Sequence, residues 1–191
     1  MRTRIQENRM NIKLSRHQWI TEAFAVLAEA GVDGIKIEGL AKRLRVTKGG
    51  FYWHFRNRED LLLHMLEQWR VGRIETIHEQ TRDEDHAADT LKYLIRLYTD
   101  STNLRGNAIE LAVRDWARSD SRAAEAVEAV DRERLDCVSS LFAQLDLSPD
   151  DAYSRAYLFY SFIFGQSLLN DDSCRLEPKK IKQFCTRFLV S

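Results

Sequence analysis

The sequence is poor in the residues that turns and covalent crosslinks require. Its 191 residues include only 2 prolines and 8 glycines, too few for many short strands joined by tight turns, so an all-α protein is predicted. The three cysteines, Cys137, Cys174 and Cys185, are odd in number and form no Cys-x-x-Cys pair. A disulfide framework or a zinc site is therefore not expected, and we predict reduced cysteines that mainly serve packing.

Long hydrophobic runs are missing as well. No apolar stretch approaches the roughly 18 residues of a membrane span. Residues 1–15 lack the apolar segment of a secretory signal. We therefore expect a cytoplasmic protein.

The formal net charge is zero, but the charge is unevenly distributed. Up to Arg58 the chain has 12 Lys and Arg against 5 Asp and Glu, a local charge of +7, and the remaining 17 against 24 give −7. This asymmetry is expected where one end of a protein meets nucleic-acid phosphates. Chance clustering on a solvated face is the alternative explanation.

Capping residues and apolar spacing predict short helices in the first third of the chain. Ser15 and Gln18 form a capping-box pattern at the start of a helix that ends before Gly31. A second short helix has apolar residues at the i, i+3, i+4, i+7 spacing of one face, namely Ile37, Leu40, Ala41 and Leu44. Thr47 can cap a third helix, and the three helices surround one small core.

The second and third helices, with the turn between them, form a helix-turn-helix pattern over about residues 36–55. Phe51 and Phe55 are four residues apart and share a buried face. The opposite side of the same helix then presents four residues to a partner, Lys48, Gly49, Tyr52 and Trp53. We expect this side to enter the DNA major groove.

Each residue type on this side suits contact with DNA. Glycine lowers helix stability by roughly 1 kcal/mol relative to alanine, and a close approach to the duplex explains its presence at position 49. Tyr52 and His54 can donate hydrogen bonds to phosphate oxygens, and Lys48 can reach a phosphate or a guanine edge. Trp53 can press against sugar or a thymine methyl, and Arg58 adds a cation at the amino end of the next helix.

Residues from about Lys13 to Arg73 resemble the DNA-binding domain of the TetR family of transcriptional regulators. The stretch VTKGGFYWHFRNREDLL, residues 46–62, resembles the signature of that family almost throughout. The resemblance implies a basic, flexible arm at 1–12, a DNA-binding domain at 13–73, and an effector-binding and dimerisation domain at 74–191. It also implies a homodimer formed through the last two helices.

Three residues depart from the family pattern. Lys36 stands where Thr or Ser usually caps the second helix, Arg45 occupies a turn position that is commonly Gly, and Arg58 replaces a common Lys. Either the turn has another geometry or Arg45 adds a DNA contact. The predicted DNA-binding residues are Lys36, Arg45, Thr47, Lys48, Gly49, Tyr52, Trp53, His54 and Arg58.

Periodicity and caps predict about nine helices in total, with a fourth that Asn57 caps and that runs beyond Arg70. Ser148 and Pro149 supply a cap and a first-turn proline for the penultimate helix, and the last helix follows Pro178. These two helices are more apolar than one buried stripe requires. A homodimer interface explains the excess, with a deeper monomer core as the alternative; the interface candidates are Phe162, Gln166, Leu169, Ile181, Phe184 and Phe188.

An effector pocket is harder to place, because the pocket and the core of a helical bundle use the same residue types. The candidates are the large aromatic or polar residues of helices four to eight, where the family has its pocket: His64, Trp69, Tyr98, Arg114, Trp116, Phe142 and Phe159. Plain packing is the alternative role for each of them. Trp116 is the favoured candidate because ionisable residues flank it.

Other site types have no recognisable motif. The five histidines include no His-Glu-x-x-His pair, so no metal and no cofactor is expected. No nucleophile elbow or phosphate loop is present, so an enzyme is not expected.

The prediction is a ligand-responsive regulator that binds a palindromic operator and is released by a small-molecule effector. That it acts as a repressor follows from the habit of the family, since no residue fixes the sign of regulation. The alternative is a helix-turn-helix adaptor or the DNA anchor of a non-transcriptional factor.

Overall fold

A computed structural model describes residues 14–82, 86–99, 104–169 and 174–190. All regular elements in these ranges are helical, nine α-helices and one short 3-10 turn, which confirms the predicted all-α class. The chain forms two compact units, residues 1–65 and 66–191. The division falls inside one long helix, and the boundary predicted at residue 73 lies further along the same helix. The arm predicted at 1–12 lies outside the described residues.

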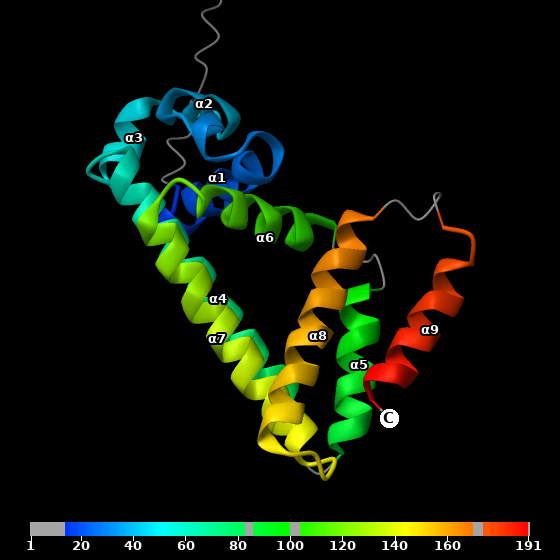
Figure 1. The fold of residues 1–191 in the computed structure, drawn as a ribbon. Helices are drawn as coiled ribbons and strands as arrows, with labels where there is room; N and C mark the ends of the chain where they lie inside the picture. Colours follow the sequence, from blue (N-terminus) through cyan, green and yellow to red (C-terminus); the bar gives the residue numbers. More distant parts are fainter. Residues whose placement is uncertain (1–13, 83–85, 100–103, 170–173, 191) are drawn as a thin grey trace, which may run out of the picture. The chain divides into compact units, whose positions relative to one another are not determined.

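The first unit contains three short helices, a 3-10 turn and the start of a long helix (Figure 1). They are α1 (Arg16–Ala30), η1 (Val32–Gly34), α2 (Ile37–Arg43), α3 (Lys48–Tyr52) and α4 (Arg58–Thr81).

Local capping explains where these helices begin and end. Ser15 and Gln18 form both hydrogen bonds of the predicted capping box. Gly31 ends α1 with a φ of 68°, a left-handed conformation that suits glycine, and its N–H donates to the carbonyl of Leu27. The side-chain oxygen of Asn57 accepts the N–H of Asp60 at 2.9 Å, which confirms Asn57 as the cap of α4.

An aromatic group forms the centre of the first unit. Trp19 and Phe51 are fully buried and meet edge to face with ring centroids 5.4 Å apart, and Phe55 lies 5.2 Å from Phe51. The prediction that Phe51 and Phe55 share a buried face is confirmed. Burial of a phenylalanine contributes about 1.5–3 kcal/mol, so these rings strongly fix the orientation of α3.

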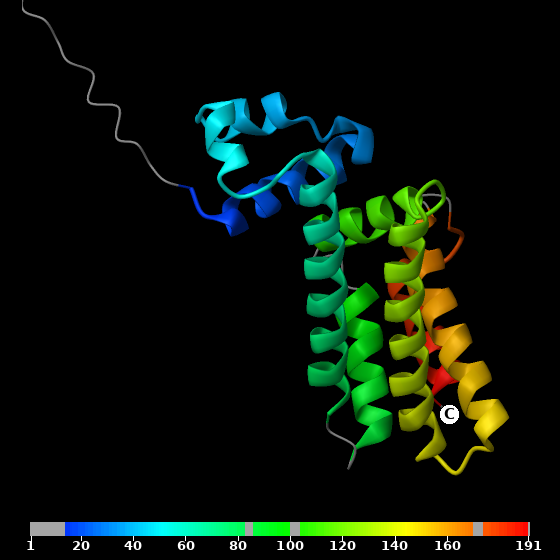
Figure 2. The ribbon, with the colours of Figure 1, turned by 90° about the vertical axis from the view of Figure 1, so that its left-hand side faces the viewer.

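The second unit is a helical bundle, completed by the rest of α4. Its further helices are α5 (Ala87–Thr99), α6 (Leu104–Trp116), α7 (Ser121–Ala143), α8 (Pro149–Leu168) and α9 (Pro178–Leu189). Helices α5, α7 and α8 pack against one another and run roughly side by side, while α6 crosses them and packs on α7 (Figure 2). Helix α9 packs on α5 and α8.

Caps and an apolar core stabilise the bundle. The Ser148 side chain accepts the N–H of Asp151 and Pro149 fills the first turn of α8, as predicted. The Asp120 side chain accepts the N–H of Arg122 and caps α7. The core residues with the least exposure include Leu91, Leu94, Val138, Leu141, Phe142, Ala156 and Phe159.

None of the described helices combines the length and the hydropathy that a membrane span needs.

Candidate functional site

One face of α3 is exposed and is rich in aromatic and basic groups. We call Lys48, Gly49, Tyr52 and Trp53 the reading face. Tyr52 is 58% and Trp53 is 83% exposed, whereas the neighbouring Phe51 is fully buried. The prediction that the buried phenylalanines turn this face outward is therefore confirmed. Helix α3 itself ends at Tyr52, so Trp53 and His54 lie just beyond its last residue.

The glycine of the reading face is not required by the conformation or packing of the first unit. A Cβ added at Gly49 would lie 3.7 Å from the Thr47 hydroxyl oxygen, which is ordinary contact. The only glycine with positive φ in the described chain is Gly31. The absence of a side chain at position 49 is therefore not explained by the packing of the first unit.

Lys48 is linked to the preceding helix by an exposed ion pair. Its ammonium group contacts the Glu38 carboxylate, and this hydrogen bond raises the pKa of Lys48. The same bond is the largest cause of the lowered pKa of Glu38. Both side chains are more than half exposed, so the pair contributes little stability and leaves Lys48 accessible to a phosphate.

The turn before α3 has a left-handed residue at Arg45. Arg45 adopts a φ of 58°, the left-handed conformation that favours glycine, and its side chain is exposed. Its N–H donates to the carbonyl of Lys42, and the next N–H, of Val46, donates to the carbonyl of Ala41. The turn thus keeps the left-handed geometry despite the arginine.

Two N-cap positions in the first unit have no capping side chain. Lys36 and Thr47 occupy the N-cap positions of α2 and α3, and both are exposed. Neither side chain makes a capping hydrogen bond, so the cap predicted for Thr47 is wrong in its chemistry. The Thr47 hydroxyl therefore stays available at the start of α3.

Arg58 has a structural role that the sequence did not indicate. Its Nε donates to the carbonyl of Ile35 at 2.7 Å and one terminal nitrogen donates to the carbonyl of Val32 at 2.6 Å. The other terminal nitrogen lies 3.3 Å from Glu59. Its donors are thus engaged within the first unit, where Arg58 links α4 to η1 and Ile35, and the phosphate contact expected of it stays a prediction.

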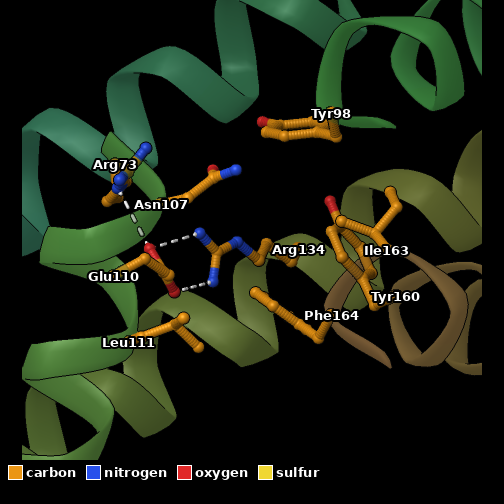
Figure 3. A pocket seen from close by; sticks show the side chains of 9 residues that line it. All are labelled: Arg73, Tyr98, Asn107, Glu110, Leu111, Arg134, Tyr160, Ile163 and Phe164. Carbon is orange, nitrogen blue, oxygen red and sulfur yellow. Dashed lines mark hydrogen bonds and ion pairs between the residues drawn. The ribbon is translucent and has the colours of Figure 1, made fainter. Parts of the chain in front are cut away.

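A polar pocket lies inside the second unit (Figure 3). Five helices contribute to it, and its lining residues are Arg73, Tyr98, Asn107, Glu110, Leu111, Arg134, Tyr160, Ile163 and Phe164. The cavity measures about 30 Å³. This volume admits ordered water and is far below the roughly 300 Å³ at which ligand pockets begin.

Buried charges form one wall of the pocket. We call Arg73, Glu110, Arg114, Asp131 and Arg134 the ionic cluster. Glu110 and Arg134 are only 5% and 4% exposed, and their side chains form two hydrogen bonds of 2.8 and 3.1 Å. Arg73 reaches Glu110 at 3.2 Å and Arg114 reaches it at 3.0 Å. Arg114 also forms a two-bond pair with Asp131.

The ionic cluster keeps the Glu110 carboxylate fully ionised. Burial raises the pKa of Glu110, but hydrogen bonds and charges from Arg134, together with the charges of Arg73 and Arg114, outweigh burial and lower that pKa to about 2. Burial also lowers the pKa of Arg134, and its hydrogen bonds to Glu110 more than reverse this effect. With three arginines and two carboxylates, the cluster has a net positive charge.

Aromatic rings cover the cluster on the other side of the pocket. The Arg114 guanidinium lies 4.3 Å from the Phe164 ring centroid, and that of Arg134 lies 5.4 Å from it. Tyr98 donates a hydrogen bond of 2.6 Å to Gln80. Burial raises the pKa values of both Tyr98 and Tyr160, so both phenols stay neutral.

Most of the predicted pocket residues lie elsewhere. Of the predicted residues, only Tyr98 lines the pocket. Arg114 is not in the lining but pairs with Glu110, which is. Phe142 and Phe159 belong to the apolar core and touch each other, with ring centroids 6.3 Å apart.

The other three predicted pocket residues are also outside the lining. His64 belongs to the first unit, where it contacts Arg16 and the carbonyl of Asp60. Trp116, the favoured candidate, is buried and does not line the pocket. Trp69 is buried as well, and its indole N–H has no hydrogen-bond partner in the described part of the chain.

The sequence did contain a signal for the charged wall. On α7, Val130, Arg134 and Val138 follow one another at intervals of four residues and therefore share a face. An arginine within an apolar stripe must find a buried partner or stay unpaired, so this position predicts a buried ion pair.

The last two helices expose large apolar side chains. On α9, Phe184 and Phe188 are 58% and 65% exposed and stack with ring centroids 6.3 Å apart. Leu169, at the end of α8, is exposed too, whereas Phe162, Gln166 and Ile181 are half-buried. An exposed apolar group of this size is typical of an interaction surface.

Comparisons with known proteins agree with the N-terminal motif. Residues 20–65 match the model of the family described as bacterial regulatory proteins, tetR family. The chain is 35% identical over 80 residues to the tetracycline repressor protein class C of Escherichia coli, which covers 42% of this chain and 36% of the repressor. It is 46% identical over 50 residues to the class A repressor from transposon 1721, also of Escherichia coli, which covers 26% of this chain and 23% of that repressor. The matches thus span about a third or less of these relatives.

Solved structures resemble nearly the whole chain. The regulator FadR from Bacillus subtilis, in complex with stearoyl-CoA, has a TM-score of 0.68 at 18% identity over 93% of this chain and 98% of its own. A regulator of the TetR/AcrR family from Thermobifida fusca has a TM-score of 0.63 at 21% identity over 92% and 96%. A protein from Saccharomonospora viridis in complex with choline has a TM-score of 0.73 at 16% identity over 91% and 94%. Residues 20–65 thus match the tetR family of bacterial regulatory proteins, and over most of its length the chain shares the all-helical fold of these solved structures.

Proposed function

We propose that this protein is a ligand-responsive transcriptional repressor, which binds a palindromic operator as a homodimer and releases it when a small-molecule effector enters the pocket. The observation that carries the DNA-binding part is the reading face, which combines exposed aromatic and basic groups with a glycine that packing does not require. Family and fold favour a regulatory over a catalytic role.

On the operator, we propose that Tyr52 and Thr47 contact phosphates while Lys48 reads or neutralises the groove edge. Arg45 is exposed at the turn and supplies a further cation. Two reading faces related by a twofold axis, about 34 Å apart, would match two half-sites of one palindrome.

The test uses two exposed tyrosines as a matched pair. An operator is first selected from random DNA with the full chain, and binding is then measured by fluorescence anisotropy. Tyr52→Ala should lower operator affinity at least tenfold, while Tyr93→Ala, which removes a 48% exposed tyrosine from α5, should not change it. Equal affinity of both variants would contradict the assignment of the reading face.

Salt dependence separates the repressor from an adaptor that does not use phosphate contacts. Neutralisation of phosphates by Lys and Arg releases counterions, so affinity should fall steeply as salt rises. Salt-independent binding, or no selected DNA, would favour the adaptor.

For the homodimer, we propose that the exposed apolar groups of α8 and α9 pack against their twofold copies. Phe184→Glu combined with Phe188→Glu should give monomers by light scattering, and Tyr93→Glu should leave the dimer intact. A dimer that persists in the variant with both Phe184→Glu and Phe188→Glu would contradict this interface.

The effector is proposed to bind where the pocket is found. Since the cavity of about 30 Å³ cannot hold an organic molecule, an effector must separate its walls. Arg73, on α4, and Tyr98, on α5, belong to those walls. Helix α4 also begins in the first unit, where Asn57 caps it. An effector that favours a widened bundle can therefore change the affinity for DNA. DNA binding then changes the affinity for the effector by the same factor.

The charge of the ionic cluster suggests the ligand class. Arg73 and Arg134 face a single carboxylate in the pocket lining, so we propose an organic anion with an apolar body that contacts Tyr160 and Phe164. FadR and the Saccharomonospora viridis protein were solved with stearoyl-CoA and choline respectively, so proteins of this fold bind both anionic and cationic ligands. A screen for release of operator DNA should yield anions, and Tyr98→Ala should reduce the response without changing binding to DNA alone.

A further inference from the structure

Three side chains of the kinds that bind transition metals meet between α4 and α7, outside the pocket lining. They are His78 on α4 and Glu133 and Cys137 on α7. One donor atom from each lies within 4.8 Å of the other two. Because His78 and Glu133 lie 55 positions apart, their spacing matches no metal motif, and no sequence pattern indicates this group.

The positions of the three residues are fixed by the helices. Glu133 and Cys137 are four residues apart on α7 and therefore share one face. His78 approaches from α4, with its Nε2 at 2.5 Å from the Oε1 of Glu133. Thr81, one turn further along α4, lies beside the Cys137 sulfur. The two helices thus already hold the three donors together.

The distances are close to those of a tetrahedral site. With bonds of about 2.0–2.3 Å to the ion, two ligand atoms of a tetrahedral zinc site lie roughly 3.3–3.6 Å apart. The Cys137 sulfur and the Glu133 oxygen are 3.6 Å apart, so this pair fits as it stands. The His78 nitrogen would have to withdraw by about 1 Å, which a side chain that is 56% exposed can do by rotation.

Exposure and chemistry both suit an ion of the zinc type. His78 is exposed, while Glu133 and Cys137 are half-buried, so an ion could enter from solvent and keep a water as fourth ligand. Imidazole, thiolate and carboxylate together favour zinc over magnesium or calcium, which prefer oxygen ligands. Binding would release the thiol proton, because the thiolate is the ligand.

We propose that His78, Glu133 and Cys137 form a binding site for a zinc-like divalent ion that ties α4 to α7. The ion would join two helices that are otherwise linked at this point by the hydrogen bond between His78 and Glu133. The binding site stands without the proposed repressor function. One consequence does rest on that function: a metal-tied α4 should resist widening of the pocket and raise the effector concentration needed for release.

Direct metal binding is the test, and it needs no DNA. The full chain, without a histidine tag, is titrated with Co²⁺, whose spectrum reports tetrahedral geometry and a thiolate ligand, and then with Zn²⁺ in competition. We expect one ion per chain, a sulfur-to-cobalt charge-transfer band and displacement by zinc. Cys137→Ser should abolish the band, and His78→Ala and Glu133→Gln should each weaken affinity at least tenfold.

Controls separate this site from incidental binding. Cys185→Ser removes another half-buried thiol and should leave spectrum and affinity unchanged. Zinc should also raise the Tm of the wild type and the Cys185→Ser variant but not that of Cys137→Ser. Wild-type binding no stronger than that of the His78→Ala, Cys137→Ser double variant would overturn the site, whatever the outcome of the operator experiments.

Discussion

The reading face and the pocket are built in opposite ways. The reading face comes from one run of residues on a single helix and the position just after it, with polar and aromatic groups outside and apolar rings beneath. The pocket takes its lining from five helices and has charged groups at its buried centre. Periodicity along the chain therefore reveals the first site, whereas the second depends on contacts between residues far apart in sequence.

The two sites also differ in how their stability responds to mutation. Beneath the reading face the free energy comes from apolar burial, which is nondirectional and tolerates changes on the solvent side. In the ionic cluster, removal of one charge leaves its buried partners with less compensating charge. Substitutions should therefore be milder on the reading face than in the cluster.

The largest effect is expected in the ionic cluster. Glu110→Gln should lower the free energy of unfolding by about 3–5 kcal/mol, because the 4% exposed Arg134 loses its closest charged partner and keeps only the longer contact with Asp131. Glu128→Gln breaks an exposed pair with Arg132 and should change stability by less than about 1 kcal/mol. Urea unfolding measures both. Similar effects of the two variants would show that the buried pair is no more important than a surface pair.

Acid should remove the same contribution from the wild type. The folded pKa of Glu110, about 2, lies below its ordinary value of 4.5, so its stabilisation is present above pH 4.5 and is lost as pH falls toward 2. A shift of this size corresponds to about 3 kcal/mol. The stability difference between the wild type and Glu110→Gln should therefore shrink between pH 5 and pH 3 in urea titrations. A constant difference would assign the effect of the variant to packing.

Within the first unit, Arg58 and Lys48 should differ in whether they contribute to stability or to DNA binding. Arg58→Met removes two hydrogen bonds from a charged donor to carbonyls and should destabilise the first unit by about 1.5–3 kcal/mol. Lys48→Ala should leave stability within about 0.5 kcal/mol but reduce the salt dependence of operator binding by about one unit. Thermal unfolding and binding across a salt series measure the two effects. The reverse result would return Arg58 to the phosphate contact predicted from sequence.

The smallest effect separates stability from function at one residue. Gly49→Ala should stabilise the first unit by up to about 1 kcal/mol, since alanine is the better helix former and its Cβ has room. The same methyl group should weaken operator binding if the duplex approaches this point closely. Thermal unfolding and anisotropy of one variant test both statements. Unchanged affinity would mean that DNA does not approach Gly49.

The success of sequence-based prediction followed the range of the interactions. The burial of Phe51 and Phe55, the exposure of Tyr52 and the caps at Ser15 and Asn57 depend on neighbours within four residues, and the structure confirms them. Of the predicted pocket residues only Tyr98 lines the cavity, because an aromatic side chain on a bundle helix looks the same in sequence whether it lines a cavity or fills the core.

By itself, the sequence determined the helical class, the helix-turn-helix and the outward direction of the reading face, since helical periodicity and capping act over a few residues. Only the tertiary structure decided that Arg58 donates to the carbonyl of Ile35, that Glu110 pairs with Arg134, and that His78 meets Glu133. These contacts join residues 23 to 55 positions apart. Their formation depends on how the helices pack, which no local pattern encodes.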